Sequence, residues 1–422
     1  MKNQSKKNYL LFILLIALPG YYYGQTKNIE SYEKLYFEGL YTDVIRTLIK
    51  VEPQKRIADE WFYLAQSYSA LKDYSNAFSS YRSAIEKNPD HAGYKLQYAR
   101  LLNIYGNAKE AGTLYNEILT TDSVNIPALS ELGLIYVNNK EYNKSLPLYE
   151  RLVRLNSNDF LSNYYIAYSL FQTARSQADS VKVYNSLMKC FFVNNKYIPV
   201  IDLTASYFYS KGQYIFAASQ YGLIERLSPN NPEPLYKDGL CLEKVKFHEA
   251  AANRFLKAVK LDSANFNYYS HLGYNYFLTG KNDSAIITFK KALLLNKDNP
   301  TICLNLGMAY LNIDSLALAR SCFEKASANY GIEQYSFIQN QLAYINLKQR
   351  NIKPAKEYCD KVLMLDPQNA PAQYNLARCY DELGNAKIAV VNYQKALPLL
   401  SEAANLKDEL EFAKKRLKEL KK

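Results

Sequence analysis

Two blocks of 34 residues lie back to back between Phe266 and Gly331 and carry the same residue types at the same offsets. Each block has a leucine-glycine pair, an aromatic residue three places after the glycine, and then an alanine, a phenylalanine and a second alanine. The matching residues are Tyr269, Leu272, Gly273, Tyr276, Ala285, Phe289 and Ala292, then Cys303, Leu306, Gly307, Tyr310, Ala319, Phe323 and Ala326. The spacing predicts two amphipathic helices per block, packed closely where the residues are small.

The same pattern recurs along most of the chain in steps of 34 residues. Its clearest single copy consists of Trp61, Leu64, Ala65, Tyr68, Ala77, Tyr81, Ala84 and Pro89. Further copies begin at Ala92, Ile126 and Phe160. The frame is then interrupted by a longer segment near 173–197 and resumes at Ile198. This insertion is explained either by a bend between two halves or by a longer loop.

These residues resemble the tetratricopeptide repeat, whose pattern is W-x2-L-G-x2-Y, A-x3-F, A and P. The resemblance implies an all-α fold, a right-handed α-solenoid of stacked helix-turn-helix repeats of the exported bacterial type. Stacked repeats share one continuous core, so the length of 422 residues does not predict several separate globular domains. The expected divisions are a signal peptide at 1–24, a degenerate first repeat at 25–57, four units at 58–197, six units at 198–401, and a C-terminal capping helix at 402–422.

The last segment, residues 402–422, has apolar residues three and four places apart on an otherwise charged sequence. One apolar stripe predicts a helix that covers the end of the last repeat. A short coiled coil is the alternative, since the stripe extends over about three heptads.

The amino end places lysines ahead of an apolar run from Tyr9 to Leu18, followed by Pro19 and Gly20. That order is typical of a secretory signal, and the run is shorter than the ~20 residues that span a bilayer. We therefore expect an exported protein in the periplasm or associated with the outer membrane, with cleavage near Gly24. Tyr22 is bulky for a position two places before such a cut, which leaves cleavage after Gly20 or an uncleaved membrane anchor as alternatives.

The formal net charge of +12 raises the question of nucleic acid binding. Three of these charges belong to Lys2, Lys6 and Lys7 in the predicted signal. The remainder is modest for a chain of this length, and export separates the protein from nucleic acid. We expect no nucleic acid partner.

Motifs for catalysis and for metal binding are missing. His248-Glu249 begins like a metalloprotease helix, but Ala252 stands where the second histidine is required. Gly280-Lys281 lacks the serine or threonine and the upstream glycine of a phosphate loop, and no G-x-S-x-G turn occurs. We expect no enzyme activity, no cofactor and no metal.

The six cysteines include no pair separated by two residues. Cys303 and Cys359 stand at repeat positions that the family fills with large apolar residues, which favours buried thiols that act as small hydrophobic side chains. A bridge between Cys303 and Cys322 within one repeat is the alternative in an oxidising compartment. The sequence does not decide the pairing.

In the family, the first helix of each repeat lines a concave groove with its second, fifth, ninth, twelfth and thirteenth residues. The versions that clamp a peptide carboxylate resemble one another in having lysine at the fifth place and asparagine at the ninth, and this chain has neither. Its groove positions are instead aromatic and apolar. The predicted partner-binding residues are Tyr164, Tyr168, Phe171, Tyr209, Tyr236, Tyr274, Phe277, Met308 and Tyr344.

Tyrosine offers a large contact area with few rotamers to freeze, so these positions suit an extended peptide or a partner helix. We expect a non-catalytic scaffold of the cell envelope that binds partner proteins or peptides, with association at the outer membrane or the cell wall. The alternative is a binder of cell-wall glycan or polysaccharide, because the same rings can stack on sugars. With 40 tyrosines in the chain, ordinary packing between repeats is a competing role for each of them.

Overall fold

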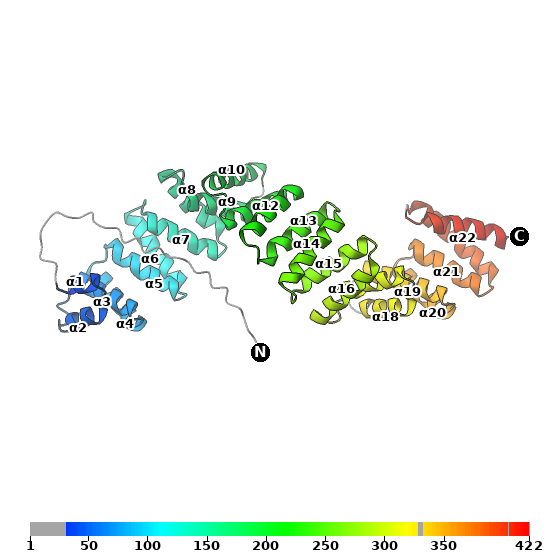
Figure 1. Cartoon of the computed structure of the whole chain (residues 1–422), viewed down its shortest axis with the longest axis horizontal. Helices are drawn as coiled ribbons and strands as arrows, with labels where there is room; N and C mark the ends of the chain where they lie inside the picture. Colours follow the sequence, from blue (N-terminus) through cyan, green and yellow to red (C-terminus); the bar gives the residue numbers. More distant parts are fainter. Residues whose placement is uncertain (1–30, 175, 328–331, 404, 422) are drawn as a thin grey trace. The chain divides into compact units, whose positions relative to one another are not determined.

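The computed structural model describes residues 31–174, 176–327, 332–403 and 405–421. The predicted signal peptide at 1–24 lies outside these residues. The regular structure of the described part consists of 23 α-helices (Figure 1). The chain forms two compact units, residues 1–162 and 163–422, with the division inside helix α9.

In the first unit the helices alternate, so that odd-numbered helices open a repeat and even-numbered helices complete it. They are α1 Ser31–Phe37, α2 Tyr41–Leu48, α3 Ala58–Ala70, α4 Tyr74–Lys87, α5 Ala92–Ile104, α6 Ala108–Thr121, α7 Ile126–Asn138 and α8 Tyr142–Leu155. Helix α9, Phe160–Thr173, opens the next repeat.

The second unit continues the alternation. Its helices after α9 are α10 Gln177–Val193, α11 Ile198–Ser210, α12 Tyr214–Leu227, α13 Pro232–Lys244, α14 His248–Leu261, α15 Phe266–Leu278, α16 Asn282–Leu295, α17 Pro300–Asn312, α18 Leu316–Ser327, α19 Ile332–Lys348, α20 Ile352–Leu365, α21 Ala370–Glu382, α22 Ala386–Glu402 and α23 Lys407–Leu420.

Helices pack in chain order within each unit. In the second unit, for example, α13 packs on α14, α14 on α15 and α15 on α16. One buried cluster extends from Leu235 in α13 to Ile345 in α19, so neighbouring repeats share one core. This arrangement confirms the predicted all-α solenoid of stacked helix pairs.

Small residues in the first helix of a repeat make room for a ring from the second. A Cβ built on Gly239 would lie 2.7 Å from Cε1 of Phe255, and one on Gly133 would lie 2.9 Å from Cε2 of Tyr149. Because real Cβ atoms do not approach that closely, the glycine is required wherever the ring is seated in this way. In these repeats the recurring spacing between the glycine and the ring therefore has a steric cause.

Helix ends follow the local chemistry of the turns. Gly280 closes α15 with a φ of +73°, in the left-handed region that glycine adopts at little cost. Asn299 caps α17 through its side chain, and Pro300 is the first residue of that helix. Helix α16 begins at Asn282, and its N-cap residue Lys281 makes no capping hydrogen bond through its side chain.

The insertion near 173–197 adds residues to helices. Helix α10 has 17 residues, whereas α8 and α12 have 14, and α9 has 14 where α7 has 13. The connections on either side keep ordinary lengths. The extra residues therefore lengthen this repeat along its helix axes.

The final helix, α23, packs on α22. Ala413 and Leu417 are its buried residues, and they join the cluster formed by Tyr393 and Ala396 of α22. Its remaining surface is rich in lysine and glutamate. The helix thus buries its single apolar stripe on the last repeat and presents a charged face to solvent.

Across the described ranges, no helix combines the length and the apolar character that crossing a membrane requires.

Candidate partner-binding groove

The nine predicted groove residues all lie on first helices of the second unit. Their helices are α9 for Tyr164, Tyr168 and Phe171, α11 for Tyr209, α13 for Tyr236, α15 for Tyr274 and Phe277, α17 for Met308, and α19 for Tyr344. None is fully buried: Tyr274 is 36% exposed and the other eight are half-buried. Each of these side chains therefore keeps some surface for contact while part of it is packed.

The structure brings some of these residues together and leaves others apart. The rings of Tyr164 and Tyr168 lie 6.2 Å apart on one face of α9, and Tyr197 packs edge-on against Tyr164 at 6.1 Å. Tyr209 packs on Tyr214 at 5.1 Å, within its own repeat. The predicted set is thus a series of local clusters rather than one continuous stack of rings.

Tyr236 packs against three aromatic rings. Its ring centroid lies 5.8 Å from Phe255, 5.1 Å from Tyr268 and 5.6 Å from His271. Two of these neighbours belong to the next repeat, so much of the ring serves packing between repeats. Its free edge is correspondingly small, which makes Tyr236 a weaker candidate for partner contact than Tyr274.

Burial raises the pKa of Tyr164, and neighbouring tyrosines raise it further. Burial also raises the pKa of Tyr236, with the nearby Glu233 acting in the same direction. Because ionised tyrosine is disfavoured in these surroundings, both hydroxyls stay neutral at physiological pH. Each can therefore donate one hydrogen bond and accept others.

A polar network between two repeats was not predicted from the sequence. Nδ2 of Asn275, a fully buried residue of α15, donates to Glu243 Oε2 at 2.7 Å and to the carbonyl of His271 at 2.8 Å. Its Oδ1 therefore accepts from Nδ1 of His248, 2.9 Å away. Nδ1 of His271 also lies 3.0 Å from Glu243 Oε2.

This network satisfies groups that would otherwise be costly to bury. Burial by itself raises the pKa of Glu243, but hydrogen bonds from His271 and Asn275 more than offset it, and the pKa is lowered. The carboxylate is therefore charged and holds two repeats in register. The repeat pattern gave no signal for these contacts, because they join residues 27 to 32 places apart in the sequence.

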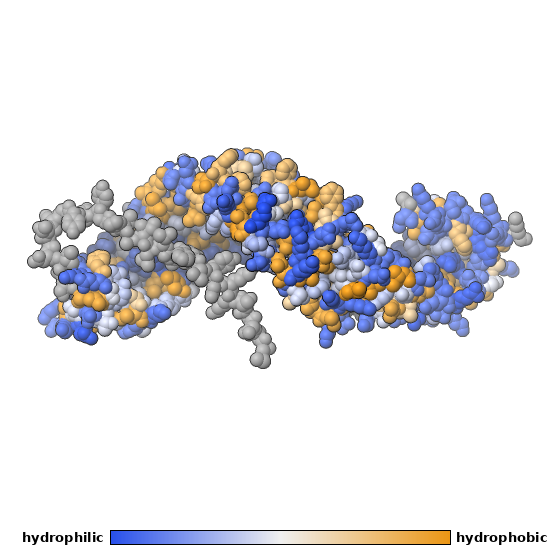
Figure 2. Space-filling view, in the orientation of Figure 1, coloured by the Kyte–Doolittle hydropathy of each residue, from blue (hydrophilic) through white to orange (hydrophobic). Residues whose placement is uncertain are grey.

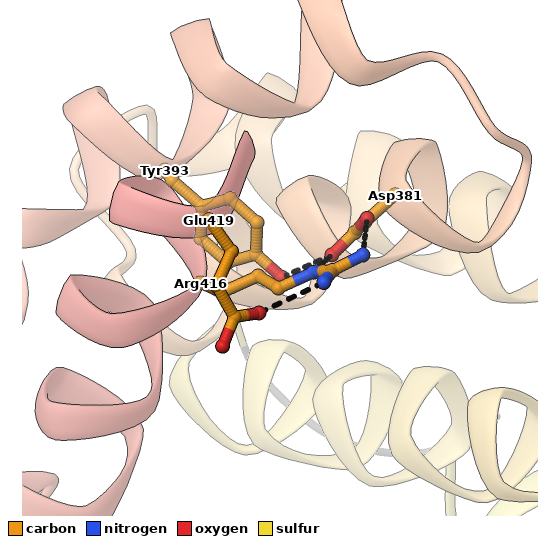
Figure 3. A network of polar contacts seen from close by, with 4 residues as sticks. All are labelled: Asp381, Tyr393, Arg416 and Glu419. Carbon is orange, nitrogen blue, oxygen red and sulfur yellow. Dashed lines mark hydrogen bonds and ion pairs between the residues drawn. The ribbon is translucent and has the colours of Figure 1, made fainter. Parts of the chain in front are cut away.

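A second network fixes the C-terminal helix (Figure 3). Arg416 of α23 donates to both carboxylate oxygens of Asp381 in α21, at 2.8 and 3.0 Å, and to Glu419 at 2.9 Å. The Tyr393 hydroxyl donates to Asp381 at 3.2 Å. A pocket of about 430 Å³ beside these groups is lined mostly by charged side chains, among them Lys415. Its open, polar walls suit solvent rather than an apolar ligand.

None of the six cysteines is in a disulfide bond, and five of them are buried. The bridge between Cys303 and Cys322 is therefore not formed, and burial raises the pKa of both thiols. The burial of Cys303 and Cys359 agrees with their interpretation as small hydrophobic side chains. In the described segments, no three His, Cys, Asp or Glu side chains are grouped in a way that could hold a metal ion.

Comparison with sequence families finds tetratricopeptide repeats in both units. Residues 42–160 match the family described as the TPR domain of cytochrome c-type biogenesis protein H. Residues 266–299, 300–328 and 346–391 match families described as tetratricopeptide repeats. Repeats of this class are non-catalytic scaffolds.

Among similar proteins, the putative cytochrome c-type biogenesis protein CcmH of Haemophilus influenzae is 30% identical over 144 residues. That alignment covers 33% of this chain and 31% of the relative, so the chain spans less than a third of it. DnaJ homolog subfamily C member 7 of Homo sapiens is 24% identical over 367 residues, which cover 82% of this chain and 68% of that protein.

Among solved structures, the C-terminal part of a TPR repeat-containing protein from Cytophaga hutchinsonii superimposes with a TM-score of 0.52 at 18% identity. It covers 58% of this chain and 98% of the other. At this level of identity the likeness concerns the fold alone. With stacked helix pairs in both units and family matches in both, the chain is a tetratricopeptide-repeat protein.

Proposed function

We propose that the protein is a scaffold of the cell envelope that captures other proteins through the first helices of its second unit. The observation that carries this proposal is the set of half-buried aromatic side chains on α9, α11, α13, α15 and α19. Within this set Tyr274 offers the most exposed ring. The bound segment is an extended peptide or a helix of the partner.

Partial burial favours binding for a physical reason. A ring that is already packed on one side, such as Tyr164 between Tyr168 and Tyr197, has little conformational freedom left to lose. Its exposed edge and hydroxyl can then contact a partner at a low entropic cost. Such pre-organised aromatic residues are typical of the few positions that dominate protein interfaces.

The envelope setting is supported by the match of residues 42–160 to the TPR domain of cytochrome c-type biogenesis protein H. The predicted signal peptide at 1–24 points the same way. The match makes a role in the biogenesis of c-type cytochromes the most specific function to test. Because the relative is covered over 31% of its length, that role is carried over as part of the proposal.

The test uses a photo-activated cross-linker placed at Tyr274 in native cells, followed by mass spectrometry. We expect a defined set of envelope proteins, and c-type cytochromes or their assembly factors among them would support the specific role. The amino terminus of the mature protein is read in the same experiment. A protein that retains its signal in the cytoplasm would refute the envelope setting.

Mutants locate the binding surface. Replacing Tyr209, Tyr274 and Tyr344 together with serine should reduce cross-linked partner at least tenfold. The matched control replaces Tyr184 and Phe192, two exposed aromatic residues of α10, which is a second helix. An equal loss of cross-linked partner in the triple tyrosine variant and in the control variant would contradict a binding site on the first helices. Binding to insoluble peptidoglycan that depends on the same three tyrosines would favour the glycan alternative.

A further inference from the structure

Five consecutive second helices of the second unit, from α14 to α22, each carry an exposed lysine at the same register. We call this set the lysine row: Lys257, Lys291, Lys325, Lys361 and Lys395. It lies on helices other than those of the proposed groove. A binding role for it is therefore independent of the proposed function.

The register of the row is fixed by burial. Lys291 stands two places after Phe289 and one place before Ala292, both of which are fully buried. The other four lysines stand in the same way between two fully buried residues. Since those neighbours point into the core, the lysines of successive repeats all point away from it on the same side of the stack.

Large apolar side chains are exposed beside the row. In α16, Ile287 is 60% exposed and Leu294 76%, four places before and three places after Lys291. In α20, Met364 is 84% exposed three places after Lys361. Residues three and four apart share a helix face, so lysines and apolar side chains lie together on it. Figure 2 shows hydrophilic and hydrophobic residues interleaved over α16 to α20.

Most members of the row have no carboxylate at ion-pair distance among the described residues. Within the described part of the chain, Lys257 is the member with a carboxylate at ion-pair distance, Glu225 at 3.7 Å. Two acidic residues adjacent to row lysines in sequence are neutralised within their own helices: Glu324 pairs with Arg320 and Asp360 with Lys356. The exposed face therefore combines free cations with apolar side chains.

We propose that the lysine row and its exposed apolar neighbours dock on the surface of an anionic phospholipid bilayer. Lysines near such a surface are attracted by its negative potential, and the effect accumulates along a row. Side chains such as Leu294 and Met364 gain by entering the boundary between headgroups and acyl chains. The second unit then lies along the membrane with its first helices free to hold a partner.

The apolar component distinguishes a bilayer from other anionic partners. Nucleic acid binding relies on phosphate contacts and on aromatic stacking, and it has no use for exposed Leu294 or Met364. Tyr358, whose ring centroid lies 5.3 Å from Nζ of Lys361, is half-buried and leaves little of its face for a base. A lipid surface accommodates both the charges and the aliphatic groups of this face.

The test is co-sedimentation of the full chain with vesicles. We expect binding to vesicles of phosphatidylcholine mixed with phosphatidylglycerol, weak binding to phosphatidylcholine alone, and loss of binding at high salt. The triple variant Lys291→Glu, Lys325→Glu, Lys361→Glu should bind anionic vesicles at least tenfold more weakly. A second variant, Leu294→Ser with Met364→Ser, should also bind more weakly, because the aliphatic insertion is lost.

The matched control reverses three exposed lysines at turns, Lys72, Lys140 and Lys246, which changes the net charge by the same amount. It should bind like the unmodified protein. Because all the altered side chains are exposed, every variant should keep its helical circular dichroism. Equal weakening by the control, no effect of the row variant, or binding to DNA but not to anionic vesicles would each overturn the proposal.

Discussion

The ring of Phe289 occupies the space beside Gly273, where any other residue would carry its Cβ. That atom would lie 2.6 Å from both Cδ1 and Cε1 of the ring. The same contact recurs between Gly307 and Phe323 in the next repeat, at 2.8 Å from Cε1. It fixes the distance between the two helices of these two repeats, which carry the groove residues Tyr274, Phe277 and Met308.

Replacing Gly273 with alanine should destabilise the second unit by about 1–3 kcal/mol, because the methyl group overpacks a dense core. The control is Gly222→Ala in α12, where a Cβ meets nothing within 4 Å. That change should stabilise the protein by roughly 0.5–1 kcal/mol through helix propensity. Urea unfolding measures the change in free energy of unfolding for both variants. Changes of the same sign would refute the proposed overpacking of Phe289 at Gly273.

Lys246 has a φ of +63° at the turn after α13, a conformation that costs an L-residue roughly 1–2 kcal/mol. Lys246→Gly should remove that cost and raise the free energy of unfolding by up to ~1 kcal/mol, since glycine also loses entropy on folding. The reverse test is Gly280→Ala at the equivalent turn, with a φ of +73°. Gly280→Ala should lower the free energy of unfolding. An unchanged thermal midpoint in both variants would contradict the left-handed backbone conformation at these two turns.

Arg416→Gln should loosen the C-terminal helix, because Asp381 loses both of its hydrogen bonds from the guanidinium group. We expect faster amide hydrogen exchange in α23 and a loss of roughly 1–2 kcal/mol. Lys414→Gln serves as control, since it removes an ion pair to Glu411 that is largely exposed. If α23 exchanges equally fast in both variants, the Asp381 contact does not hold the helix.

Ionisation of the Asp238 carboxyl should lower the free energy of unfolding as the pH rises from about 4 to about 6. Burial raises its pKa from 3.8 to about 6, although Arg254 lies 2.8 Å away and acts in the opposite direction. In this window the folded state binds more protons than the unfolded state, so the free energy of unfolding decreases with rising pH.

The comparison is with Asp238→Asn, which cannot titrate at this site. Between pH 4 and pH 6 the unmodified protein should lose more stability than the variant, by on the order of 2 kcal/mol. Parallel pH profiles for the two proteins would show that the carboxylate is not buried as the structure has it.

Much of the fold could be predicted because the same residue types recur at the packing positions of each repeat. Ala285 and Phe289 recur as Ala319 and Phe323, and all four are fully buried. The candidate site was less accessible to such reasoning. Its nine residues could be placed on first helices, but the repeat pattern did not separate Tyr274, which is exposed, from Tyr236, whose ring packs on the next repeat. Their role in binding stays a prediction.

The sequence by itself determined the helix pairs, their order and the side chains that enter the core, because a 34-residue period encodes burial locally and repeats it. The tertiary structure alone decided which polar groups meet between repeats, as when Asn275 joins His248, Glu243 and the carbonyl of His271. The reason is physical. Periodicity states that a position is buried, whereas a hydrogen bond also requires the direction and rotamer of a partner about 30 residues away, which only packed neighbours fix.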